Sequence, residues 1–218
     1  KSVCYLVSAL FTQICYSKIM KKISTYLFLI FLSHSSLSLA NDISDFQIGG
    51  ISIGDSLLKY LSKSEIIKGI EETKNAYEYL TAEFGEVYIY DGNLGNYEMM
   101  SFFVKLNDKK YNIYSIRGMI GYDDNIAECY VKKKEIEKEI SLMFKNVTRE
   151  QEDFVFPWDP TGKSHVLHEK FIFNSEGQIW ISCSEYEKSL KIKNNWEDGL
   201  SVSVKTKEVN DWLKNHIK

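Results

Sequence analysis

Ser56 is the residue best placed by its surroundings to do nucleophilic chemistry, because it lies in the short run Gly54-Asp55-Ser56-Leu57. A serine hydroxyl becomes a nucleophile when a histidine removes its proton and a carboxylate holds that histidine in place. The only late pair of these types is Asp211 with His216, and residues five apart on a helix point to different faces. The sequence therefore offers a nucleophile without a recognisable base.

This run resembles the nucleophile block of the GDSL hydrolases, which are secreted enzymes of similar length. The resemblance implies that Ser56 attacks a substrate, with an Asp-x-x-His pair as the base and a Gly-x-Asn-Asp block completing the oxyanion hole. The chain departs from both features, since the late aspartate and histidine have the wrong spacing and Gly95-Asn96 continues directly to Tyr97. We therefore expect Asp55 to cap a helix, and a secreted serine hydrolase using Ser56 is the alternative function.

Two histidines and a carboxylate, His165-x-x-His168-Glu169, are residue types that bind zinc and other divalent ions. Residues three apart on a strand point to opposite faces, so the two imidazoles would diverge there. They could converge only if residues 163 to 168 formed a loop. The sequence favours two half-exposed histidines, and we expect no metal and no cofactor.

Residues Met20 to Ala40 are typical of a secretory signal peptide. A basic pair follows Met20, an apolar stretch runs from Ile23 to Leu32, and Ser38-Leu39-Ala40 fits the site for signal peptidase. We expect residues 1–19 to be an upstream extension, residues 20–40 to be cleaved or kept as an anchor, and residues 41–218 to form one domain. The predicted location is therefore periplasmic or secreted.

The charge of the predicted domain argues against a nucleic-acid partner. The chain has 27 basic and 30 acidic residues, and four of the lysines lie in the leader, which leaves a net charge of −7. A nucleic-acid partner needs a concentrated positive surface, and none is visible in the sequence. Membrane contact is expected only if the leader is retained.

Cys129 and Cys183 are the only cysteines after the leader, and an oxidising compartment favours a disulfide between them. Cys129 lies on the apolar stripe of a predicted helix, and Cys183 shares a strand face with Ile179 and Ile181. Both side chains therefore point at one core. Two buried free thiols remain the alternative, since the sequence does not give the distance between the two residues.

The predicted elements alternate helical segments with strands. Ser56 to Leu61 and Lys63 towards Tyr79 open the domain as helices, the second with a capping box at Ser62 and Glu65. The period of the apolar residues then predicts three strands, 86–90, 100–106 and 111–120, and a long helix over 125–145. A loop over 146–163 follows. Three more strands, 166–173, 178–184 and 200–205, and a helix after Thr206 complete the predicted order.

This order predicts an α+β fold, in which two three-stranded meanders form an antiparallel sheet with the helices packed on one face. Trp180 lies on the strand face opposite Ile179, so an exposed Trp180 and the loop residue Trp158 are the candidate binding surface. The alternative is that these residues only cover the second face of the sheet.

Several segments resemble known families. Ile48 to Leu57 is similar to the opening of BamE-like and β-lactamase-inhibitory-protein-like helix-plus-meander domains. The region Gly50 to Ile66, the strand Ile181-Ser182-Cys183 and the closing Asp211-Trp212-Leu213 resemble an uncharacterised family of small exported marine bacterial proteins. The resemblance implies export and an α+β fold, and that family carries no assigned activity.

Taken together, the sequence predicts a non-catalytic binding or protein-interaction module with an envelope protein as partner. A small-ligand or sugar binder is the second alternative after the serine hydrolase. No catalytic constellation is recognisable.

Overall fold

The computed structural model describes residues 42–216, apart from residues 77–82, 91–94 and 123–124. The predicted extension, signal peptide and cleavage site lie outside the described residues, as do the last three residues expected in the second helix, 77–79.

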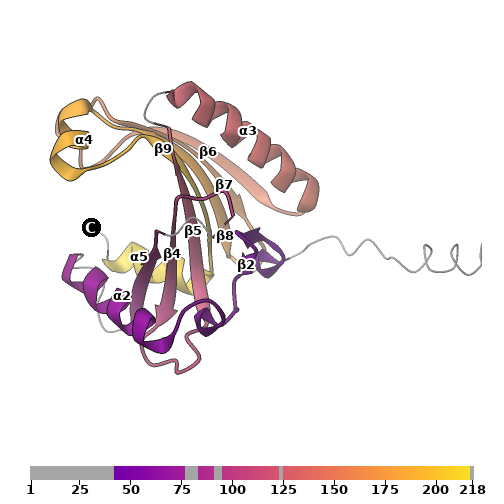
Figure 1. The fold of residues 1–218 in the computed structure, drawn as a ribbon. Helices are drawn as coiled ribbons and strands as arrows, with labels where there is room; N and C mark the ends of the chain where they lie inside the picture. Colours follow the sequence, from indigo (N-terminus) through magenta and orange to yellow (C-terminus); the bar gives the residue numbers. More distant parts are fainter. Residues whose placement is uncertain (1–41, 77–82, 91–94, 123–124, 217–218) are drawn as a thin grey trace, which may run out of the picture. The chain divides into compact units, whose positions relative to one another are not determined.

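Seven strands form one antiparallel sheet in the order β3-β4-β5-β9-β8-β7-β6 (Figure 1). Their bounds are β3 (Phe84–Ile89), β4 (Met99–Lys105), β5 (Ile113–Gly121), β6 (Thr148–Val155), β7 (His165–Ile172), β8 (Gln178–Glu185) and β9 (Gly199–Lys205). The helices are α2 (Lys63–Ala76), α3 (Ile126–Met143), α4 (Lys188–Asn194) and α5 (Lys207–His216). The predicted α+β fold with an antiparallel sheet is confirmed.

The sheet joins two meanders, β3-β4-β5 and β7-β8-β9, through the pairing of β5 with β9. Its outermost strand, β6, was not predicted, because residues 146–163 were expected to form a loop. β6 pairs with β7 over eight residues, and its side chains are exposed apart from the half-buried Phe154. α4 was also missed, since it spans only seven residues.

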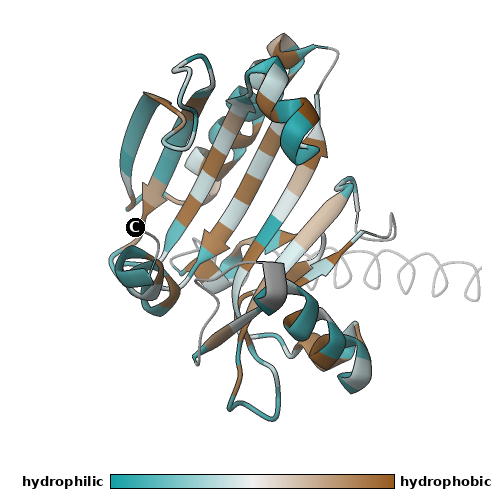
Figure 2. Ribbon diagram, turned by 90° about the vertical axis from the view of Figure 1, so that its left-hand side faces the viewer, coloured by the Kyte–Doolittle hydropathy of each residue, from teal (hydrophilic) through white to brown (hydrophobic). Residues whose placement is uncertain are grey.

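Alternate residues of the central strands divide the sheet into an apolar face and a polar face. On β4, Phe102 belongs to the main core with Val204 of β9, whereas the neighbouring Phe103 belongs to a second, smaller core. The alternation is visible as bands of changing hydropathy along the strands (Figure 2). The polar face has serine and charged side chains at the positions that lie between the core residues, among them Ser101, Ser203 and Lys205.

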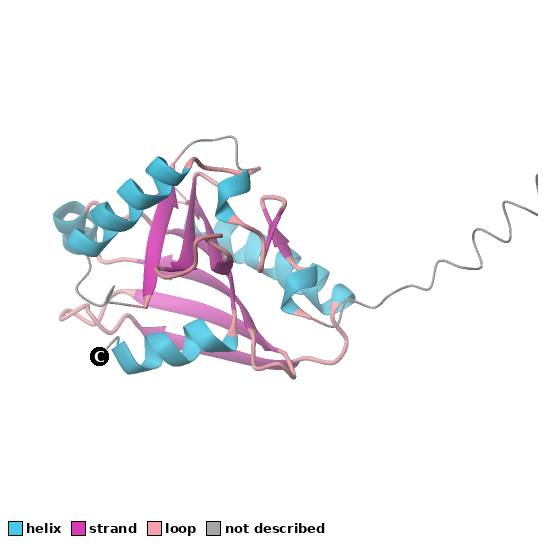
Figure 3. Cartoon of the chain, turned by 90° about the horizontal axis from the view of Figure 1, so that it is seen from below, coloured by secondary structure: helices cyan, strands magenta, loops and turns pink. Residues whose placement is uncertain are grey.

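Helices lie on both sides of the sheet (Figure 3). α2 covers the apolar face at β3, because Ile66 belongs to the main core and Gly69 lies against Val87. α3 covers the same face over β8 and β9. α5 instead packs on the polar face, where Trp212 contacts Phe84 and Phe103. The expectation that the helices share one face therefore does not hold for α5.

A disulfide joins Cys129 of α3 to Cys183 of β8, with their Cα atoms 6.0 Å apart. Of the two predicted possibilities, the structure has the disulfide and not two free thiols. Lys133, the one lysine on the apolar stripe of α3, is buried and pairs with Glu137 on the same helix. The bridge therefore anchors the middle of the sheet to the helix that covers it.

The segment around Ser56 differs from the predicted helix. Gly49 and Gly50, both at positive φ, form the turn of a small hairpin between β1 (Gln47–Ile48) and β2 (Ile51–Ser52). A single 3₁₀ turn, η2 (Leu57–Lys59), follows, and Ser56 rather than Asp55 caps it. The Asp55 carboxylate accepts hydrogen bonds from Ser52 and Lys59 instead. The capping box predicted for α2 is confirmed: the Glu65 carboxylate accepts from the Ser62 amide at 2.7 Å, and the Ser62 hydroxyl accepts from the Glu65 amide at 3.3 Å.

Candidate functional site

A cavity of about 320 Å³ lies between the polar face of the sheet and α5. Its size is at the lower end of the range of pockets that bind small molecules, about 300 to 1,000 Å³. Five strands and one helix contribute the side chains that line it: Glu86, Ser101, Phe103, Ser115, Arg117, Trp180, Lys205, Asn210, Leu213 and Lys214.

An ion pair forms one wall of this sheet pocket. The Arg117 guanidinium donates to Glu86 Oε1 at 3.3 Å and to the Tyr88 hydroxyl at 2.8 Å. Glu86 is fully buried, whereas about a third of the Arg117 side chain remains accessible. A buried carboxylate is stable only when such a partner compensates for its lost hydration, so Arg117 makes a charged Glu86 tolerable there.

A lysine and a tryptophan line the pocket from the neighbouring strands β9 and β8. Lys205 Nζ lies 3.3 Å from the centre of the Trp180 ring, and the edge of His168 meets the same ring. Among the described residues, no carboxylate forms an ion pair with the Lys205 amine. Burial, followed by the positive charges of Arg117 and Lys170, lowers the pKa of Lys205 to about 7. The pocket thus contains a cationic group that lacks a counter-ion.

Three buried polar atoms on residues that line the pocket have no hydrogen-bond partner in the described part of the chain. They are Glu86 Oε2, the hydroxyl oxygen of Ser101 and the side-chain nitrogen of Asn210, Nδ2. Buried polar groups in folded proteins are almost always paired, and each unpaired group costs about 1 to 3 kcal/mol. Three such atoms on residues that line one cavity form a set of donors and acceptors that a polar ligand could complete.

The structure separates the two histidines predicted as metal ligands. His165, at the start of β7, is exposed and lies 4.0 Å from Asp153, whereas His168 is buried beside Trp180. Burial, and then the charges of Lys170 and Lys205, lower the pKa of His168 to about 4, so the imidazole is neutral at pH 7. No group of three or more metal-binding side chains occurs in the described residues.

Ser56 has a structural role in η2. Its hydroxyl donates to the Lys110 carbonyl at 2.5 Å and accepts from the Leu58 amide. His216 contacts the Trp212 carbonyl through Nδ1, and Asp211 pairs with Lys207, so both partners expected of a hydrolase are engaged within α5. No hydrogen bond links Ser56 to a histidine in the described part of the chain.

The two tryptophans predicted as one binding surface belong to different sites. Trp180 lines the sheet pocket, while Trp158 is 59 % exposed and packs against Phe156 in an aromatic cluster with Trp196 and Tyr186. This cluster borders a second hollow, of about 540 Å³, beside α4.

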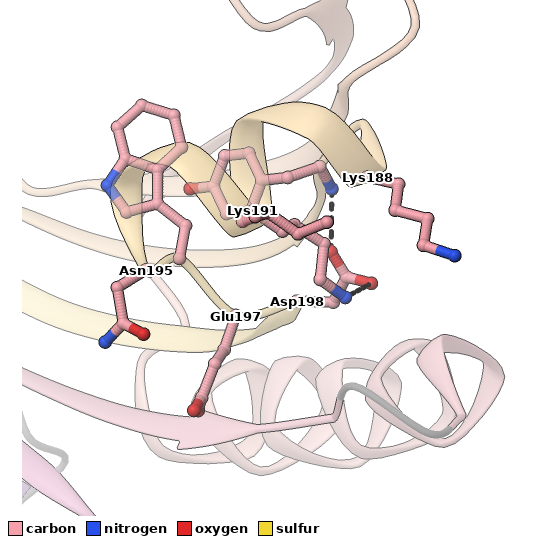
Figure 4. Close-up of a pocket in the computed structure, with 8 residues that line it drawn as sticks. Lys188, Lys191, Asn195, Glu197 and Asp198 are labelled. Atoms are coloured by element: carbon pink, nitrogen blue, oxygen red, sulfur yellow. Dashed lines mark hydrogen bonds and ion pairs between the residues drawn. The ribbon is translucent and has the colours of Figure 1, made fainter.

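The hollow beside α4 is built differently from the sheet pocket. Its central charges compensate each other, since Lys191 Nζ lies 2.8 Å from the Asp198 carboxylate, which also accepts from the Tyr186 amide (Figure 4). Lys188 and Glu197 extend away from that pair in different directions (Figure 4). The hollow is more open but presents no buried unpaired polar atom among the described residues, so the sheet pocket is the stronger candidate.

No protein-family model, no curated protein and no solved structure matched the chain in the comparisons made. Among the described residues, none of the helices combines the length and the apolar character that a membrane-spanning helix needs.

Sequence reasoning found Trp180 but missed Glu86, Arg117 and Lys205. A signal for them was present, because Ser115 and Arg117 on one strand and Ser203 and Lys205 on another occupy the positions that alternate with core residues. Aligning these positions into one patch requires the pairing of β5 with β9, which no local pattern reveals.

Proposed function

We propose that this domain is an exported, non-catalytic binding protein that holds a small polar ligand in the sheet pocket. The observation that supports this most is the set of three buried, unpaired polar atoms on residues that line the cavity. A fold retains such atoms at a cost in stability, and a ligand that pairs with them recovers that cost on binding. The disulfide and the absence of a membrane-spanning helix among the described residues are compatible with export.

The test is a screen of small polar compounds by ¹H–¹⁵N NMR, with shifts mapped onto the amides of β3, β4, β5, β9 and α5. Ser115→Leu should abolish the shifts, because Ser115 lines the cavity and a leucine side chain there fills it. Ser201→Leu is the matched control, since Ser201 lies on the same face, on β9, without lining the cavity. Shifts that survive Ser115→Leu, or that map elsewhere, would contradict the proposal.

A second candidate function is protein docking at the surface beside α4. Ile192 is 75 % exposed and Trp158 is 59 % exposed, and both border the same aromatic cluster. Exposed apolar side chains of this size are typical of protein contact sites, and the predicted export makes an envelope protein the natural partner.

Crosslinking in cell envelopes, followed by binding measurements with the purified partner, tests this second function. Trp158→Ala with Ile192→Ala should abolish binding. The matched control is Val131→Ala with Leu142→Ala, which removes two equally exposed apolar side chains from α3. Equal binding by both double variants would exclude the surface beside α4.

A further inference from the structure

The charges around the sheet pocket indicate what kind of ligand it selects. Glu86 and Arg117 neutralise each other. Lys205 and Lys214 also line the cavity, and neither forms an ion pair in the described part of the chain. Lys170 lies on β7, next to β8, and its amine pairs with the Glu152 carboxylate at 2.8 Å. Its charge is therefore already balanced within the protein. When the Lys205 amine is protonated, the pocket therefore has an excess of positive charge that an anionic ligand can balance.

The unpaired atoms indicate which hydrogen-bond donors and acceptors the ligand carries. Asn210 Nδ2 is a donor and requires an acceptor, as does the Lys205 amine. Glu86 Oε2 is an acceptor that requires a donor, and the Ser101 hydroxyl can serve as either. A ligand that satisfies all four groups carries both a negatively charged acceptor and at least one hydrogen-bond donor.

We propose that the sheet pocket selects a small hydroxylated carboxylate, whose carboxylate is held by Lys205 and Asn210 and whose hydroxyl donates to Glu86. A zwitterionic amino acid fits less well, because its ammonium group would cancel the negative charge that the surplus lysines require. A neutral sugar offers the hydroxyl groups but no anion. This inference rests on the proposed function and names the ligand class for the same pocket.

The pH dependence of binding provides an independent test of the role of Lys205. The charged groups that face its amine are Arg117 on β5, Glu86 on β3, and Lys170 beside the neutral His168 on β7, with Lys214 on α5 across the cavity. In the ligand-free protein this amine loses its proton near pH 7. A bound carboxylate favours the charged form, so binding takes up a proton above pH 7, and affinity should fall by up to about tenfold per pH unit there.

The experiment is calorimetric titration of the purified protein with D-glucuronate, D-glucose, acetate and L-serine at pH 6.5, 7.5 and 8.5. Glucuronate should bind at least about tenfold more tightly than the other three probes, a difference of about 1.4 kcal/mol. Its affinity should fall from pH 7.5 to pH 8.5. Glucose or serine binding as tightly as glucuronate would overturn the ligand class.

Variants locate the interaction. Lys205→Met should weaken glucuronate binding at least tenfold and abolish its pH dependence above 7. The control Lys134→Met, at an exposed position of α3 that does not line the pocket, should change affinity less than twofold. Glu86→Gln should preserve glucuronate binding, since a glutamine oxygen still accepts from a hydroxyl, but would abolish binding of an ammonium-bearing ligand. Thermal unfolding of each variant verifies that it is folded.

The outcomes separate this inference from the proposed function. If a neutral or zwitterionic probe binds in the pocket and Lys205→Met does not affect it, the ligand is not a carboxylate. The proposal that the pocket binds a small polar ligand is then retained. If none of the probes binds and the small-molecule screen finds no compound that Ser115→Leu excludes, both are overturned.

Discussion

Lys205 and Trp180 lie diagonally across the pairing of β9 with β8, with the lysine amine 3.3 Å from the centre of the indole ring. The ring attracts the ammonium form through its electron-rich face, but it cannot replace a carboxylate or water as a hydrogen-bond partner. The same contact therefore holds the amine in position for a ligand and leaves it incompletely stabilised in the ligand-free protein.

Stability should depend on pH through Lys205. Its pKa is lowered to about 7 from 10.5, so between these pH values the unfolded chain binds more protons than the folded protein. The free energy of unfolding should accordingly rise with pH from about 7 to 10. Lys205→Met should abolish this rise and stabilise the protein below pH 7 by about 1 kcal/mol, measured by urea unfolding at several pH values. An unchanged slope in the variant would contradict the assignment.

His168 should produce a second pH effect at lower pH. Its pKa is lowered to about 4 from 6.5, so the unfolded chain takes up a proton in this window that the folded protein does not. Stability contributed by the neutral imidazole is complete above pH 6.5 and is lost as the pH falls towards 4. His168→Phe preserves the edge contact with Trp180 and should flatten the stability curve between pH 4 and 6.5. His165→Phe, at the exposed position, should leave that curve unchanged.

Breaking the disulfide should destabilise the domain without changing its fold. Cys129 and Cys183 are 54 residues apart, and a bridge closing a loop of this size contributes about 2 to 5 kcal/mol. Cys129→Ala with Cys183→Ala should lower the free energy of unfolding by that amount in urea titrations. Intact mass after alkylation, with and without prior reduction, checks the bridge directly: labelling of these two cysteines without reductant would show that they are free.

Gly199 should not tolerate a side chain. A Cβ atom there would lie 2.5 Å from the Ile120 carbonyl oxygen, a backbone atom of the paired strand that cannot move aside without disturbing the β5–β9 pairing. Gly199→Ala should cost about 1 to 3 kcal/mol in thermal or urea unfolding. Gly121→Ala is the matched control across the same pair, because its Cβ would meet only the flexible ends of Glu98 and Glu197. Equal costs for the two variants would refute this explanation.

The fold was largely predictable because most elements carry a strong local period. Alternating apolar residues located six of the seven strands of the large sheet to within a few residues, and Thr206 caps α5 as expected, accepting from the Val209 amide. β6 was missed because its residues are polar on both faces, so its strand conformation depends on the backbone of β7 rather than on burial. The side covered by α5 was missed for a related reason: an apolar helix stripe shows that a helix packs, but not on which face.

The candidate site was less predictable than the fold. Trp180 stood out by its residue type, whereas Glu86 and Lys205 are ordinary charged residues. The importance of Glu86 comes from its burial, and that of Lys205 from neighbours far away in the chain. Glu86 on β3 and Lys205 on β9 line one pocket only because the sheet places β3, β4, β5 and β9 side by side in the right register. Trp158 was correctly expected to be accessible, but its partners Phe156 and Trp196 come from segments that the sequence did not place together.

The central place of β9 has a consequence for how the chain can assemble. β9 is the last of the seven strands of this sheet in sequence order, yet it pairs with both β5 and β8. Until residues 199–205 are available, each meander presents an unpaired inner edge, and such edges bind other chains readily. The sheet closes only through contacts between residues distant in sequence, which makes closure slow. Completion of this sheet must therefore follow the synthesis of residues 199–205, and a truncation before β9 leaves two unpaired strand edges in place of one continuous sheet.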